Sequence, residues 1–99
     1  MKPKYCGIIW YKSEDDYKKA LSIFKDSFKL PATYKDFLVG FDKAAAFARF
    51  NGMIPIKAEL DPYTFSAWCE ERSLNIDATG REFYANWKAR EHLRKKGEF

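Results

Sequence analysis

Residues Gly52 to Cys69 read GMIPIKAELDPYTFSAWC, and this stretch contains a helix end, a strand and the start of another helix. Gly52 stands where a helix usually ends, because glycine adopts a positive φ without a Cβ clash. Apolar residues then alternate with others from 53 to 60, which predicts a strand with one buried face. Pro55 lacks an N–H group, so this strand is expected at the edge of a sheet.

The end of the same stretch has the features of a helix N-terminus. Asp61 offers a side-chain acceptor to free N–H groups, and Pro62 is preset for a first helical position. Apolar side chains then recur at helical spacing, which predicts a helix with an aromatic inner face: they are Phe65, Trp68 and Cys69.

An earlier segment, residues 5–11 with the sequence YCGIIWY, predicts a first strand that is apolar on both faces. Strands of this kind are usually covered on both sides or lie in the middle of a sheet. One explanation is a homodimer in which two first strands pair through Tyr5, Ile9 and Tyr11, giving a four-stranded sheet with Pro55 at each outer edge. The alternative is that helices of the same chain cover both faces.

Three further helices are expected from their caps and apolar periodicity. Ser13 begins a helix that ends at Leu30, Thr33 begins a helix over 34–50, and Asp77 begins the last helix, which runs to about Lys96. Gly40, Ala44 and Ala48 would form a shallow groove on the second helix. The expected fold is α+β in the order βααβαα. Because short links reverse the chain at each element, the two short strands are predicted to be antiparallel.

The composition indicates one small soluble domain. The chain has 99 residues, of which 46% are hydrophobic, 18% aromatic and 32% charged, with a net charge of +4. It contains neither a membrane-spanning apolar run nor a signal-peptide pattern, so a cytoplasmic protein without membrane contact is expected. The charge is modest for a dedicated nucleic-acid binder.

Two short motifs resemble those of a loose group of small uncharacterised bacterial proteins. The first is Leu30-Pro-x-Thr-Tyr34 followed by Phe37-Leu38, and the second is Leu60-Asp61-Pro62-x-x-Phe65-x-x-Trp68-Cys69. The resemblance covers most of the chain but consists of caps and core aromatic residues. It implies a bacterial or phage origin and carries no established activity.

The pattern does not indicate catalysis or a bound cofactor. Cys69 and His92 are the one nucleophile–base pair to consider, and a buried structural cysteine is the stronger interpretation of Cys69. Glu70 and Glu71 are adjacent in sequence and diverge on a helix, which favours surface solvation. No metal motif, phosphate loop or cofactor signature is present, so neither a metal nor a cofactor is expected.

The last helix carries the most basic surface. From residue 81 onward there are six basic and three acidic residues, a local charge of +3, whereas residues 59–77 hold five acidic residues and one basic, a local −4. The basic side chains are candidate contacts for an anion or a nucleic acid: Arg81, Lys88, Arg90, Arg94, Lys95 and Lys96. A solvated helix face and attraction between acidic and basic segments of two subunits are the alternatives.

The leading hypothesis is a non-catalytic interaction or regulatory module acting as a homodimer. Nucleic-acid binding is second and a thiol enzyme using Cys69 third; a small-molecule ligand cannot be named.

Overall fold

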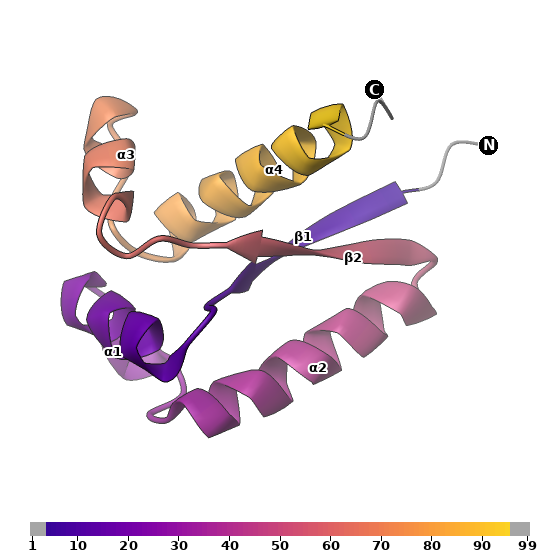
Figure 1. The fold of residues 1–99 in the computed structure, drawn as a ribbon, viewed down its shortest axis with the longest axis horizontal. Helices are drawn as coiled ribbons and strands as arrows, with labels where there is room; N and C mark the ends of the chain where they lie inside the picture. The colour runs from indigo at the N-terminus through magenta and orange to yellow at the C-terminus, as the bar shows by residue number, and fades with distance from the viewer. Residues whose placement is uncertain (1–3, 96–99) are drawn as a thin grey trace.

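A computed structural model describes residues 4–95 as a two-stranded sheet between two long helices (Figure 1). The elements, in chain order, are β1 (Lys4–Trp10), α1 (Glu14–Ile23), the 3-10 turn η1 (Ser27–Lys29), α2 (Tyr34–Phe50), β2 (Met53–Glu59), α3 (Phe65–Glu71) and α4 (Ala78–Lys95). Helix α2 covers one face of the sheet and α4 covers the other, while α1 and α3 lie at the end of the sheet where both strands finish.

The two strands are parallel, so the predicted antiparallel arrangement is wrong. The prediction counted each helix as one reversal along the sheet. In the structure α1 lies beyond the end of the sheet, and η1, absent from the predicted order, turns the chain so that α2 alone returns along the strands. A single returning helix makes β1–α2–β2 a crossover connection, which requires parallel strands. The register pairs Gly7 with Ile56.

The predicted bounds of α2 are confirmed, because both of its ends are fixed by local chemistry. The Thr33 hydroxyl accepts a hydrogen bond from the Asp36 N–H at 3.1 Å. At the other end Gly52 has φ of +75°, the left-handed conformation predicted from its position. This turn leads directly into β2, whose residues Ile56 and Ala58 are buried, as the alternating pattern indicated.

Helices of the same chain cover both faces of β1. Trp10 lies against α2, where its ring is 4.8 Å from that of Phe41. On the opposite face Gly7 lies so close to α4 that a Cβ there would be 2.4 Å from the carbonyl oxygen of Ala85. The apolar character of both faces of β1 is therefore explained within one chain, which was the alternative to strand pairing between two copies.

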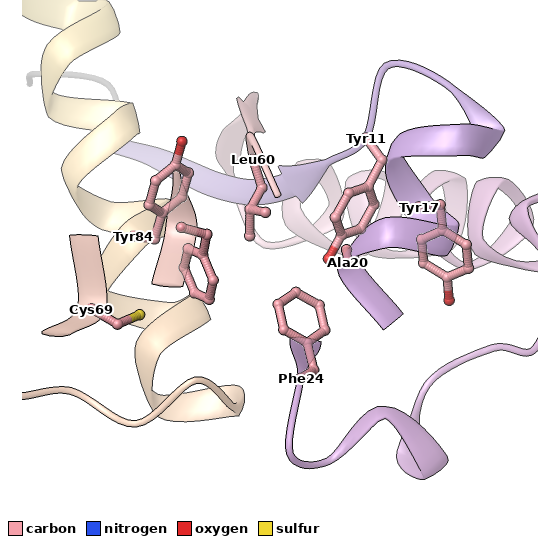
Figure 2. Packing of buried hydrophobic residues seen from close by; sticks show 8 residues of the cluster. Tyr11, Tyr17, Ala20, Phe24, Leu60, Cys69 and Tyr84 are labelled. Carbon is pink, nitrogen blue, oxygen red and sulfur yellow. The ribbon is translucent and has the colours of Figure 1, made fainter. Parts of the chain in front are cut away.

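The main core lies at the carboxyl ends of the strands, where α1, α3 and α4 meet (Figure 2). Its fully or nearly fully buried residues come from five segments: Tyr11, Tyr17, Ala20, Phe24, Leu60, Phe65, Cys69 and Tyr84. The carboxyl end of a parallel sheet is where α/β proteins commonly bind ligands. Here aromatic side chains fill that position.

Two predicted helix boundaries are wrong for tertiary reasons. Helix α1 ends at Ile23 rather than Leu30, because the next segment turns toward the last helix and the Lys25 N–H donates to the Ile76 carbonyl at 2.9 Å. Helix α3 begins at Phe65 rather than directly after Asp61. The Asp61 carboxylate instead accepts from the Tyr63 N–H at 2.9 Å and closes a turn before the helix.

Candidate binding surfaces

Arg81, a predicted anion contact, is engaged within the chain. Its guanidinium donates two hydrogen bonds to the Asp26 carboxylate, at 2.7 and 2.8 Å, and lies 4.6 Å over the Phe24 ring. Both charged side chains are nearly buried. Asp26 also accepts from the Ala78 N–H at 3.2 Å, so it binds the first turn of α4 as well. Arg81 therefore stabilises the fold through Asp26 and is not part of the exposed basic surface.

The other predicted basic residues occupy different positions along α4. Lys88 lies 5.3 Å over the Trp87 ring, and Arg94 is 3.6 Å from Glu91. Arg90 and Lys95 are exposed and form no ion pair within residues 4–95. Lys96 lies outside the described residues. Within the described part of α4, the exposed basic residues are thus Arg90, Arg94 and Lys95, all in its second half.

Arg90 lies at the edge of a pocket between α3 and α4, which we call the aromatic pocket. Its volume is about 360 Å³, and its apolar lining comes from Trp68, Leu74, Phe83 and Trp87. Arg72, Asn86 and Arg90 supply its polar groups. The two indole rings are tilted by 47° with their centroids 5.6 Å apart. An apolar hollow with a few convergent polar groups has the usual character of a small-molecule site.

Arg72 is fixed in the wall of the aromatic pocket. Its guanidinium lies 4.3 Å over the Trp68 ring, and its Nη1 donates to the Trp68 carbonyl at 3.1 Å. The carboxylate of Glu71 is 3.5 Å from the same nitrogen and is largely exposed. A guanidinium has five N–H donors, so these two contacts leave donors for a further anion. Arg72, Phe83 and Asn86 were not predicted from the sequence as site residues. The helical spacing of residues 83, 86, 87 and 90 was the signal that could have indicated a shared surface.

The structure does not bring Cys69 and His92 together. Cys69 is fully buried, and its sulfur lies beneath the first turn of α4, where a Cβ added to Gly80 would be 2.9 Å from it. His92 is exposed twelve residues further along the same helix, about 18 Å along its axis at 1.5 Å per residue. Burial raises the pKa of the Cys69 thiol, which disfavours the thiolate. Within residues 4–95 no group of three or more His, Cys, Asp or Glu side chains is placed to hold a metal ion.

The predicted dimer strand has one free edge but little free side-chain surface. Tyr11 is 2% exposed, while Tyr5 and Ile9 are partly buried and pack against core clusters. The Leu60 N–H donates to the Trp10 carbonyl, and peptide groups alternate in direction along a strand. The backbone N–H and C=O groups of Gly7 and Ile9 therefore point away from β2. The same alternation directs the nitrogen of Pro55 to the outer edge of β2, as predicted.

A second apolar surface lies on α2, and of its residues only Gly40 and Ala44 were predicted from the sequence, as part of a groove. Phe47 is 68% exposed and Phe50 is 89% exposed, although α2 is the main helix on its side of the sheet. Gly40 and Ala44 are also exposed, and spacings of three, four and seven residues place them on the same side of a helix as Phe47. We call residues 40, 44, 47 and 50 the outer face of α2. A Cβ added to Gly40 would have nothing within 4 Å, so the surface is open at that position. Ala48, the third residue of the predicted groove, is only 2% exposed, so the groove does not extend over all three residues as predicted.

Comparisons with known proteins identify no relative: no family model matches the chain, and no curated protein or solved structure resembles it significantly. The resemblance to a bacterial group stays a prediction. Among the described helices, none combines the length and apolar character needed to cross a bilayer.

Proposed function

We propose that the protein is a non-catalytic interaction module that acts as a homodimer through the outer face of α2. The observation that carries this proposal is the exposure of Phe47 and Phe50 on one side of a 17-residue helix. With about 200 Å² for each phenylalanine, these two side chains alone leave roughly 300 Å² of aromatic surface in water. The largest apolar patch on a typical monomer is about 300–600 Å² and is often functional, so we take this face as the candidate interface.

A second copy of the chain fits this face because the face is self-complementary. Phe47 forms a ridge, and Gly40, two helical turns away, leaves a hollow in the surface. If two α2 helices pack antiparallel around residues 43 and 44, Phe47 of each copy lies over Gly40 of the other. Lys43 is the charged residue in the centre of the contact, and its stem can lie along the apolar surface with its ammonium group in water.

Size-exclusion chromatography with light scattering tests the dimer at about 50 µM, where a micromolar Kd gives mostly dimer. The expected mass is about 23 kDa, twice the 11.6 kDa of the chain. The Phe47→Ser/Phe50→Ser variant should elute as a monomer. The matched control is Phe28→Ser, which removes a 79% exposed phenylalanine from η1, outside the outer face of α2, and should remain dimeric. A wild-type mass near 12 kDa contradicts the proposal.

A variant of β1 separates this interface from strand pairing. Ile9→Pro removes an N–H group that points away from β2, so it blocks an added strand without removing a β1–β2 hydrogen bond. Ile9→Ala reproduces the loss of packing and leaves the edge intact. If the α2 interface is correct, both variants stay dimeric. Loss of the dimer in Ile9→Pro alone would assign it to the edge of β1 instead.

A second candidate function is nucleic-acid binding through α4, favoured by the exposure of Arg90, Arg94 and Lys95 on the helix that also carries Trp87. A labelled oligo-dT of about 15 nucleotides, titrated at roughly 50 and 200 mM salt, should then lose affinity with salt. Arg94→Glu/Lys95→Glu should weaken binding and lower the salt slope by about 1.4, as expected for two lost phosphate contacts on a single strand. The charge-matched control Lys19→Glu/Lys35→Glu, on α1 and α2, should leave the slope unchanged. Equal effects of both double variants would exclude a specific α4 surface.

A further inference from the structure

We propose that the aromatic pocket binds a small aromatic anion, a single ring system bearing a carboxylate or a phosphate. The proposal concerns the surface between α3 and α4 and does not depend on dimerisation through α2.

The shape of the pocket limits the ligand to one ring system. Its volume of about 360 Å³ is at the small end of the range for ligand pockets. Trp68 and Trp87 are tilted against each other in the lining, and Phe83 is exposed at the same opening. Because the Arg72 guanidinium lies over the Trp68 ring, Trp87 and Phe83 are the rings that a ligand would stack on. Planar rings stack favourably on such faces, so an aromatic group fits this lining better than a branched aliphatic one.

The polar groups of the pocket specify a negative charge. Arg72 is oriented by the Trp68 ring and carbonyl, and Arg90 forms no hydrogen bond or ion pair within residues 4–95. Two guanidinium groups therefore border the pocket. The carboxylate next to Arg72 is that of Glu71, which is not part of the lining and is largely exposed. Arginine forms bidentate hydrogen bonds with carboxylates and phosphates. The Asn86 side chain, which also lines the pocket, adds a donor and an acceptor.

The three tryptophans of the chain make a direct test possible by NMR. In a ¹⁵N-labelled sample each indole N–H gives a separate signal. Trp68 and Trp87 line the pocket, whereas Trp10 lies on the opposite side of the sheet beneath α2. Phenylacetate and adenosine 5′-monophosphate are titrated to about 10 mM, above the millimolar Kd expected for a small open pocket. At least one of them should shift the Trp68 and Trp87 signals and leave the Trp10 signal unchanged.

Matched compounds and variants identify the source of any binding. Phenylacetamide and adenosine lack the charge, and acetate and phosphate lack the ring, so each should bind more weakly than its parent. Response to phenylacetate alone indicates a carboxylate ligand, and response to the nucleotide alone indicates a phosphate ligand. Arg90→Gln should weaken binding roughly tenfold, as expected for a lost charge-assisted hydrogen bond. Arg94→Gln, one turn further along α4, should have little effect.

Three results would overturn the proposal. These are no shift of the Trp68 and Trp87 signals with either anion, equal shifts with the neutral analogues, and a parallel shift of the Trp10 signal. Binding of an oligonucleotide without binding of either small anion would assign this surface to a nucleic acid instead.

Discussion

Arg81 and Asp26 form a two-bond ion pair that joins helix α4 to the segment after α1, across 55 positions in the chain. The guanidinium donates to both carboxylate oxygens while the same carboxylate accepts from the Ala78 N–H. Together with the hydrogen bond from the Lys25 N–H to the Ile76 carbonyl, the ion pair holds the segment between α1 and η1 against the start of α4. This segment precedes α2, the helix that returns along the sheet and makes the strands parallel.

Removing one partner of this pair should destabilise the folded protein, because the other charge would remain nearly buried without a partner. Arg81→Met is expected to lower the free energy of unfolding by about 3 kcal/mol at pH 7. Urea unfolding at a fixed protein concentration measures the change. The control is Arg94→Met, whose surface pair with Glu91 should contribute less than about 1 kcal/mol. Equal losses in the two variants would show that the Asp26 contact contributes nothing specific.

The same pair predicts an acid-sensitive stability. The hydrogen bonds from Arg81 hold the pKa of Asp26 below its ordinary value. The carboxylate therefore adds stability above the unfolded-state pKa of about 4, and that stability is lost as the pH falls through the lower folded-state pKa. Asp26→Asn should be less stable than the wild type at pH 7, and the difference should shrink below about pH 4. A difference that stays constant from pH 7 to pH 3 would refute the assignment.

The Tyr34 hydroxyl should contribute measurably to stability. It donates to the Tyr11 carbonyl at 2.6 Å and so connects the start of α2 to the end of β1. Tyr34→Phe removes this donor, with an expected loss of about 1–2 kcal/mol in the free energy of unfolding. Tyr63→Phe is the matched control, because Tyr63 is largely exposed and its hydroxyl has no hydrogen-bond partner within residues 4–95. Thermal unfolding of both variants provides the comparison.

Those features that depend on neighbouring residues could be predicted from the sequence. The Ser13 and Thr33 hydroxyls each accept a backbone N–H three residues on, and Gly52 takes the left-handed conformation, because caps and turns are determined within a few residues. The strand direction could not be predicted in this way. It depends on where α1 packs, and the buried contact between Asp26 and Arg81 spans more than half the chain.

The candidate pocket was missed because periodicity does not reveal which neighbour covers a helix face. Residues 83, 84 and 87 form one apolar stripe on α4, yet Tyr84 is buried while Phe83 is 55% exposed. Helix α3 covers the stripe on one side only, and the gap beside it becomes the aromatic pocket. In the same way α2 shows several apolar residues, but only its packing on the sheet shows that Phe47 and Phe50 face outward.

Gly7 is required for the close contact between β1 and α4. Gly7→Ala would place a methyl group 2.4 Å from the Ala85 carbonyl oxygen, so the helix must move away from the sheet. We expect a loss of about 1–3 kcal/mol, the usual cost of overpacking. Gly40→Ala is the control at a protein concentration low enough to keep the chain monomeric, because Gly40 lies in the proposed α2 interface. Its methyl group meets no atom of its own chain within 4 Å and should raise the stability of the monomer by about 0.5–1 kcal/mol. Opposite signs for the two substitutions in urea unfolding would confirm the packing.

The two cysteines should differ sharply in their reactivity. Cys69 is fully buried with a raised thiol pKa, whereas Cys6 on β1 is partly accessible. Because the thiolate is the species that reacts, iodoacetamide should modify Cys6 in the native protein and should reach Cys69 only after unfolding. Mass spectrometry of the digested protein measures the two rates separately, with a urea-unfolded sample as the control. Rapid native alkylation of Cys69 would show that α3 opens from α4, and it would return the thiol-enzyme hypothesis to consideration.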